Sequence, residues 1–321
     1  MVLEDVETGR VMGAASLGMK QMTWINDNTG DNVESGKVGH CFNLRLHPDY
    51  RGKGLSKPLA QKRKELAAAH GCTHIYGAVA PTNTPSLRLW EPLCDSTNHW
   101  VFMLEIDQLP PLPNNSVAIK ASCQEIPKGP QAGALMRQTH GKKLFFPCDI
   151  DDLSQHSNCL GTFQGNYNSS DDNESTTTSV LFGLWDSSAT HKWQFCFHGQ
   201  KLPVQYQAVM YGLCANNEDC RTDNDSSSSK TECFQALLHH AIESTLVGTH
   251  QRILCFVPAE SNVGHWMSSM KQPIGWEYMS DMTLNITRCT NDDNPGQQQD
   301  QSRFFSAVNS PNNVFCDPRD Y

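Results

Sequence analysis

The chain has 321 residues, 38% of them hydrophobic, which is enough for two domains with cores of ordinary size. Its formal net charge of -9 argues against a general nucleic-acid-binding protein, because phosphate backbones are held mainly by basic surfaces. No long apolar stretch or signal peptide is present, and the 13 cysteines lack C-x-x-C spacing, so we expect an intracellular protein, cytoplasmic or nuclear, without membrane or metal.

The first elements form a predicted hairpin. Met1–Asp5 and Arg10–Met22 are two expected strands, and Glu7-Thr8-Gly9 is the turn between them.

The next segment has the order of a phosphate-binding device. An apolar strand, Cys41–Leu46, leads through His47-Pro48-Asp49-Tyr50 into Arg51-Gly52-Lys53-Gly54-Leu55-Ser56 and a helix that ends at His70-Gly71. Two glycines let the backbone turn with its N–H groups pointing outward, and the helix adds the positive end of its dipole. We therefore expect this loop to bind a pyrophosphate.

Two more strands and a helix complete the first region. Thr73–Ala80 is an expected strand, Asn83-Thr84-Pro85-Ser86-Leu87-Arg88-Leu89-Trp90 starts a helix, and Trp100–Ile106 is the last strand.

These residues resemble the GCN5-related N-acetyltransferase (GNAT) superfamily. Its acetyl-CoA loop reads Arg/Gln-x-x-Gly-x-Gly/Ala, and a later helix carries Asn-x-x-Ser-x-x-Leu-Tyr. Ser56 stands where Gly or Ala is usual, and Trp90 stands where many members place a tyrosine that reprotonates the CoA thiolate. Segments further along, at 144–151, 160–163, 180–185, 210–212 and 264–266, are similar to the HOOKLESS-type plant acetyltransferases.

The resemblance implies an α/β (α+β) fold, with a mixed central sheet flanked by helices, and acetyl-CoA as cosubstrate without a metal. Backbone N–H groups of Gly52, Lys53, Gly54, Leu55 and Ser56 would hold the pyrophosphate, with charge from Arg51 and Lys53. Leu44 and Leu46 would pair with pantetheine through their backbone and polarise the thioester carbonyl. Asn83 and Ser86 would line the CoA side of the cleft, although helix capping explains both about as well.

The catalytic groups are less well defined by the sequence. No Glu or Asp lies on 41–46 to accept the proton of the attacking amine. Asn43 could hold a water there, and His40 or His47 could act as base. Because an indole cannot replace the tyrosine acid, Tyr76 is the candidate acid.

We expect the second half to repeat the order of elements of the first, with a helix near 232–246, a strand at 252–257, a helix near 265–270 and a strand at 276–284. Its counterpart of the phosphate loop, around 216–225, is rich in carboxylates that repel a pyrophosphate. We expect two tandem copies, the second degenerate, although an unrelated α+β domain is the alternative. The expected divisions are a GNAT domain at 1–107, a linker at 108–115, the second domain at 116–289 and a disordered tail at 290–321.

The first domain is short at its front, because the first strand and two helices of the resembled fold are missing. A truncated sequence, or another chain or the second domain filling the gap, would explain this.

Three functions are open: acetyl transfer from acetyl-CoA to a primary amine of a protein or small molecule, acyl-CoA binding for regulation without turnover, and a scaffold that binds a protein partner through the second domain.

Overall fold

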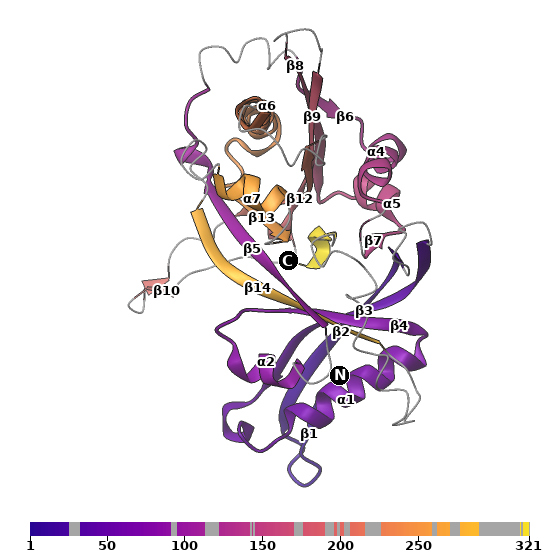
Figure 1. Ribbon diagram of the computed structural model, residues 1–321. Coiled ribbons are helices and arrows are strands. Elements are labelled where there is room, and N and C mark those ends of the chain that lie inside the picture. Colours follow the sequence, from indigo (N-terminus) through magenta and orange to yellow (C-terminus); the bar gives the residue numbers. More distant parts are fainter. Residues whose placement is uncertain are drawn as a thin grey trace. The chain divides into compact units, whose positions relative to one another are not determined.

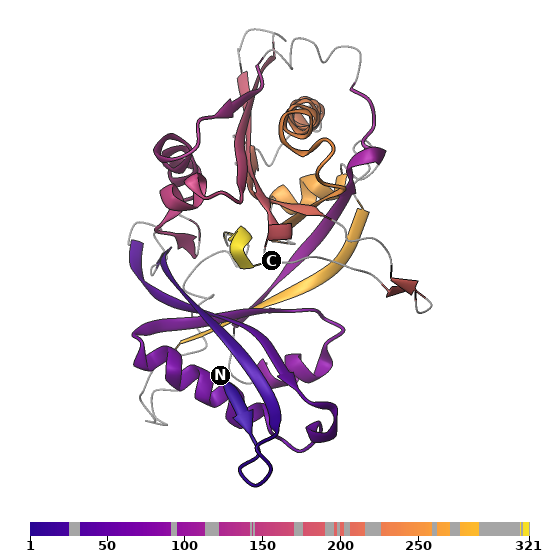
Figure 2. The same ribbon diagram turned by 180° about the vertical axis from the view of Figure 1, so that it is seen from behind.

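The computed structural model contains two compact units (Figures 1 and 2). It describes residues 1–25, 33–90, 95–112, 122–141, 143, 145–169, 176–189, 196–197, 200–201, 206–215, 226–258, 262–269, 277–288, 315 and 317–320. Unit 1 comprises Met1–His99, Lys142–Cys148 and Asp281–Val314, and unit 2 comprises Trp100–Gly141, Asp149–Ser280 and Phe315–Tyr321. The units interleave along the chain, whereas the domains predicted at 1–107 and 116–289 are contiguous; that division stays a prediction.

Unit 1 is built on a mixed sheet with the strand order β1-β2-β3-β4-β14, and β7 pairs with β2. The strands are β1 (Val2–Glu4), β2 (Val11–Ile25), β3 (Val33–Leu46), β4 (Cys72–Val79), β7 (Phe146–Pro147) and β14 (Glu277–Arg288), of which residues from 281 belong to this unit. β3 is antiparallel to β2 but parallel to β4. β14 is antiparallel to β4, from Thr283 opposite Val79 to Arg288 opposite His74.

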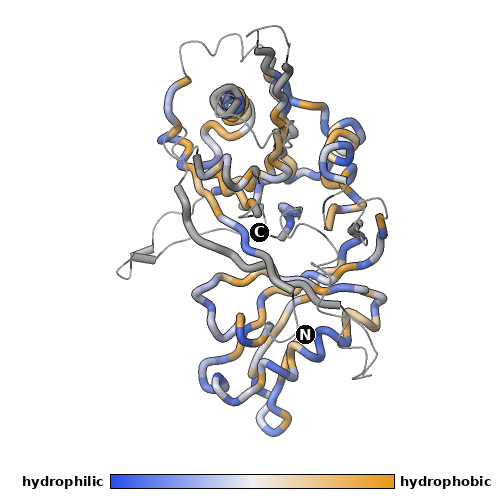
Figure 3. Tube along the Cα trace, viewed as in Figure 1, coloured by the Kyte–Doolittle hydropathy of each residue, from blue (hydrophilic) through white to orange (hydrophobic). Residues whose placement is uncertain are grey.

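Two helices cover one face of the unit 1 sheet. A 3-10 turn, η1 (Pro48–Tyr50), precedes α1 (Ser56–Ala69), and α2 (Thr84–Trp90) follows β4. α1 packs across β2, β3 and β4, and α2 lies on the same side (Figures 1 and 2). Their shared core consists of Cys41, Ala67, Cys72, Ile75, Val79 and Trp90. Hydrophilic residues predominate in the loop that enters α1 (Figure 3).

Unit 2 has its own run of strands in the order β5-β13-β12-β9-β8-β6. They are β5 (Asp95–Glu105), which starts in unit 1, β6 (Gln124–Ile126), β8 (Cys159–Ser169), β9 (Thr176–Asp186), β12 (Gln207–Ala215) and β13 (Arg252–Pro258). β10 (Cys196–Phe197) and β11 (Gln200–Lys201) form a separate hairpin. β12 is antiparallel to β9 and parallel to β13, so this sheet is also mixed.

Helices lie on both faces of the unit 2 sheet. α6 (Ser226–Ala241) lies on one face, and α4 (Pro130–His140) and α5 (Ile150–Gln155) lie on the other (Figure 1). α7 (Asn262–Ser269) packs against β12 and β13, and short turns occupy Ile106–Gln108 (η2), Ser187–Ala189 (η3), Ile242–Leu246 (η4) and Pro318–Asp320 (η6). Among the described residues, no helix is both long and apolar enough to cross a membrane.

Two segments predicted to be linker or tail pack onto unit 2. Leu109 and Leu112 lie against its core, and the Pro110 carbonyl oxygen is 2.8 Å from His239 Nε2 on α6. Near the C-terminus, Phe315 is buried next to the rings of His140 and Tyr211. The structure thus differs from the predicted tail at 315 and 317–320, while 289–314 lies outside the described residues.

Candidate functional site

β3 and β4 part from each other before β3 ends. Their parallel register runs from Lys37 opposite Cys72 to His40 opposite Tyr76. Beyond this point the pairing of β3 among the described residues is with β2, and a bulge interrupts that pairing between Ala14 and Ser16 of β2. Asn43 lies in the bulge and has a positive φ of 53°, which an asparagine tolerates better than most residues. β3 thus continues through Leu44 and Leu46 past its described pairing with β4, and a ligand backbone could pair with this part of the strand.

The predicted phosphate loop follows this edge directly. Gly52 and Gly54 have φ values of 76° and 77°, which favour glycine, and a Cβ added at either position would meet nothing within 4 Å. Leu55 and Ser56 start α1, whose first turn contains no acidic residue and no side-chain cap. The first N–H groups of α1 thus lack a capping side chain, as expected of an anion site.

The basic side chains of the loop make contacts that cost little to break. Arg51 Nε donates to the Leu46 carbonyl oxygen at 3.2 Å, and Lys53 Nζ lies 5.0 Å from the centre of the Tyr50 ring. Asp49 is the nearest acidic residue in sequence, and its carboxylate lies 3.6 Å from His47 Nδ1. Open glycines, an uncapped helix and two exposed cations fit a diphosphate group.

Asn83 and Ser86 belong to the start of α2. The Ser86 N–H lies 3.0 Å from the Asn83 carbonyl oxygen and 3.4 Å from its side-chain Oδ1. This is the geometry of a helix cap, which was one of the two interpretations of the sequence. A contact of either residue with CoA stays a prediction.

Tyr76, the candidate acid, is buried in a stack of rings on the face of the sheet opposite α1. Its ring centre lies 4.9 Å from that of His40 and 5.4 Å from that of Phe145, and the stack continues from His40 to the half-exposed Phe42 at 5.1 Å. These contacts give Tyr76 a packing role. Its role as an acid, like that of Asn43 with a bound water, stays a prediction.

A buried arginine, which was not predicted from the sequence, lies on the helix face of the site. Arg63 of α1 is 3% exposed, and its guanidinium carbon lies 5.5 Å from the centre of the Trp90 ring. Arg63 also contacts the Cys41 thiol. Burial raises the pKa of this thiol to about 11, although the Arg63 charge opposes the increase. Cys41 is thus a protonated core thiol and no nucleophile. The available signal was a charged residue on the apolar side of α1, between Leu59 and Ala67.

Unit 2 repeats the strand pattern of this site. β12 pairs in parallel with β13 from Gln207 opposite Arg252 to Met210 opposite Cys255, and a bulge follows between Tyr211 and Cys214. Gly212 in this bulge has a φ of 60°, which is positive like the 53° of Asn43 in β3. Here, however, His140 Nε2 lies 2.8 Å from the Gly212 carbonyl oxygen, so α4 covers the second bulge. The acidic counterpart of the phosphate loop lies outside the described residues.

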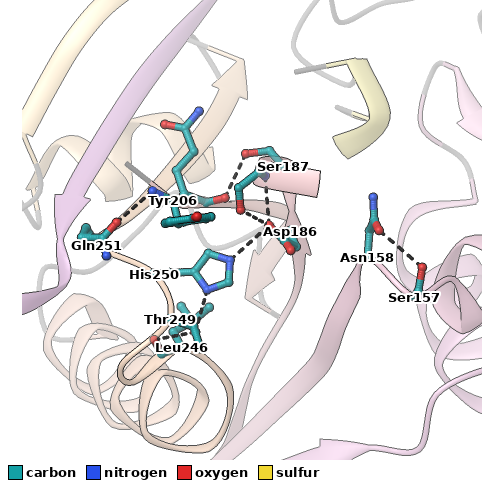
Figure 4. A network of polar contacts seen from close by, with 11 residues as sticks. Ser157, Asn158, Asp186, Ser187, Tyr206, Leu246, Thr249, His250 and Gln251 are labelled. Carbon is teal, nitrogen blue, oxygen red and sulfur yellow. Dashed lines mark hydrogen bonds and ion pairs between the residues drawn. The ribbon is translucent and has the colours of Figure 1, made fainter. Parts of the chain in front are cut away.

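A second polar cluster lies in unit 2, where β9 ends (Figure 4). His250 Nε2 is 3.2 Å from Asp186 Oδ1, and His250 Nδ1 is 2.9 Å from Thr249 Oγ1. The Thr249 hydroxyl donates to the Leu246 carbonyl oxygen at 2.9 Å, and the Ser188 hydroxyl donates to Asp186. Because each hydroxyl has one hydrogen, neither is a nucleophile activated by His250. The cluster joins β9 to the start of β13 and is structural.

Asp186 is the acceptor on which this cluster depends. Burial is the largest single influence on its pKa and raises it, but hydrogen bonds from Ser188 and His250 together outweigh burial, so the pKa lies below its usual range. The folded state therefore gains stability from the ionised carboxylate above the ordinary aspartate pKa of about 3.9, and loses it as the pH falls through the lowered value.

We expect Asp186→Asn to lower the free energy of unfolding by about 1–2 kcal/mol at pH 7, because hydrogen bonds to a charged acceptor weaken and the site is partly exposed. The difference from the unsubstituted protein should shrink when urea unfolding is measured at pH values below about 4. Asp107→Asn, at an exposed position of the same unit, is the control. A pH-independent difference would show that the charge of Asp186 is irrelevant.

Most of unit 1 is similar in sequence to a known protein family. Residues 1–94 match the acetyltransferase (GNAT) family. This range contains the bulge at Asn43, the glycine loop and the start of α2. The GNAT fold predicted from the sequence, with mixed sheets flanked by helices, is thus confirmed. No curated protein matches the chain in sequence.

Solved structures extend the likeness in fold to most of the chain. An N-myristoyltransferase of Saccharomyces cerevisiae, with bound myristoyl-CoA and inhibitors, aligns at a TM-score of 0.51 and 11% identity over 89% of this chain and 67% of that one. A GCN5-related N-acetyltransferase from Anabaena variabilis aligns at a TM-score of 0.42 and 11% identity over 90% of this chain and 62% of that one. A tandem GNAT protein from the clavulanic acid biosynthesis pathway aligns at a TM-score of 0.45 and 11% identity over 89% of this chain and 82% of that one. The chain spans less than two thirds of several GNAT chains, 62% of that from Anabaena and 57% of one from Kribbella flavida.

Proposed function

We propose that this protein is an acetyl-CoA-dependent N-acetyltransferase that acts on a primary amine of a protein or a small molecule. The observation that carries the proposal is the open loop at 51–56, at the uncapped start of α1 and next to a β3 edge that β4 leaves unpaired. CoA offers a diphosphate to the loop and an amide-containing pantetheine arm to the strand edge. The match of residues 1–94 to the GNAT family supports the same assignment.

The chemistry is direct acyl transfer. The amine nitrogen attacks the thioester carbonyl carbon, the C–S bond breaks, and the CoA thiolate takes up the proton that the nitrogen loses. Backbone N–H groups at the Asn43 bulge would stabilise the negative charge that develops on the carbonyl oxygen. A lysine amine, with a pKa of about 10.4, must lose its proton at a cost of roughly 4.6 kcal/mol to be neutral at pH 7.0. For an α-amine the cost is much lower, because its pKa near 8 lies only about one pH unit above 7.

A second candidate is an acyl-CoA-binding regulatory protein without turnover. Two structural observations favour it: Trp90 stands in the core where the resembled family places its acid, and Tyr76 is buried in a ring stack. The strand segment 41–46 also has no carboxylate to act as base.

Binding and turnover separate these candidates. Calorimetric titration with acetyl-CoA measures the first, and release of the CoA thiol in the presence of α-amine and lysine substrates measures the second. Binding with turnover supports the transferase, and binding without turnover across the amine panel supports the regulatory protein. Absence of binding by any acyl-CoA would refute both. The intracellular location, the HOOKLESS-type kinship and a protein partner for unit 2 stay predictions.

A further inference from the structure

The point where β3 and β4 separate is closed by a tryptophan. A Cβ added to Gly77 of β4 would lie 2.8 Å from the Cys41 carbonyl oxygen and 3.2 Å from Trp90 Cζ2. The two strands and the indole therefore meet at a position where only a glycine backbone fits. On the opposite face, the stacked rings of His40 and Tyr76 cover the same point.

The proposed function places the acyl group at this closed end. With the diphosphate at 51–56, the pantetheine arm runs back along β3 past Leu46 and Leu44 toward the bulge at Asn43, since the strand edge lies in that direction. Successive residues of an extended strand advance about 3.3 Å, so the arm covers these positions in roughly 10 Å. The thioester and its acyl group then lie nearest to Cys41, Gly77 and Trp90.

The indole is held firmly in this place. Trp90 is 9% exposed, belongs to the core cluster between α1, α2 and the sheet, and has the Arg63 guanidinium over its ring. A ring fixed on both sides does not swing aside at low cost, because core packing and the cation contact would both be lost.

We propose that Trp90 restricts the acyl donor to short chains, of about two to four carbons, by closing the end of the slot between β3 and β4. This inference rests on the proposed acyl-CoA binding. A methylene that enters an apolar pocket tightens binding about fourfold, so a longer chain binds better where the slot is open and worse where it is closed. Trp90 is thus a determinant of specificity and takes no part in the bond changes.

The test compares acetyl-CoA, butyryl-CoA and octanoyl-CoA in calorimetric titrations. For the unsubstituted protein, octanoyl-CoA should bind at least about tenfold more weakly than acetyl-CoA. Trp90→Leu should reverse this order of affinities. Trp90→Phe, which preserves an aromatic ring in the core, should reduce the difference in affinity between the two ligands. Leu87→Ala removes apolar bulk from the same helix and cluster without the contact to Gly77, so it should leave the order unchanged.

The possible failures differ from one another. If the unsubstituted protein binds octanoyl-CoA as tightly as acetyl-CoA, or if both Trp90 variants retain its discrimination, the role of Trp90 is overturned while the proposed function stands. If no acyl-CoA binds, the proposed function fails and this inference fails with it. Circular dichroism identifies a variant that does not fold, and Trp90→Phe then decides the outcome.

Discussion

Gly54→Asp is expected to weaken acetyl-CoA binding by at least about 100-fold. The substitution places a carboxylate where the loop would hold a diphosphate, and two like charges about 4 Å apart repel by about 4 kcal/mol at an effective dielectric constant of 20. Exposure of the loop reduces this repulsion, which is why the expected loss is smaller than the thousandfold that 4 kcal/mol would give. Calorimetric titration of both proteins measures the loss.

The chain offers a matched control at the other end of α1. Gly71 has a φ of 79°, close to the 77° of Gly54, and a Cβ added there also meets nothing within 4 Å. Gly71→Asp therefore introduces the same side chain and the same backbone strain away from the loop. It should bind acetyl-CoA like the unsubstituted protein. Equal losses in the two variants, or none in either, would contradict the assignment of the loop.

Local features of unit 1 were predictable because their signals are local in sequence. The glycines at 52 and 54 permit the left-handed backbone that this tight turn adopts, and Pro58 marks the first turn of α1. Strand alternation likewise located β4 within one residue of its observed bounds. The bulge at Asn43 was not predictable, because it depends on how β2 pairs with β3.

Long-range features could not be predicted from patterns along the chain. Residues 281–288 of β14 pair with β4, some 200 residues earlier, and this pairing makes the compact units interleave. A strand's sequence records which residues are apolar and not which strand it joins. Arg63 is a similar case, because its burial depends on Trp90 and Cys41, which come from other elements.

The C-terminal segment illustrates the same limit. Its polar composition predicted a disordered tail, but Asp317 is 2% exposed and Arg319 contacts Asp149, 170 residues earlier in the chain. One guanidinium with two carboxylate partners can order a segment that composition alone assigns to solvent.

Arg319→Ala is therefore expected to lower the free energy of unfolding by about 3–5 kcal/mol, because it leaves the Asp317 carboxylate buried without its cation. Arg319 Nη2 lies 2.6 Å from Asp317 Oδ2, and Nη1 lies 2.6 Å from Asp149 Oδ2. Urea unfolding at pH 7 followed by tryptophan fluorescence measures the change. Asp149→Asn should cost much less, because Asp149 is 41% exposed and water replaces the lost contact.

A double variant distinguishes loss of an ion pair from loss of packing. Asp317→Asn together with Arg319→Met removes both charges while retaining an acceptor for the Arg319 backbone N–H, which lies 2.9 Å from Asp317 Oδ1. Most of the lost stability should return in this variant, since it leaves no unpaired charge buried. Stability of Arg319→Ala within about 0.5 kcal/mol of the unsubstituted protein would instead show that the contacts of the Arg319 side chain do not stabilise unit 2.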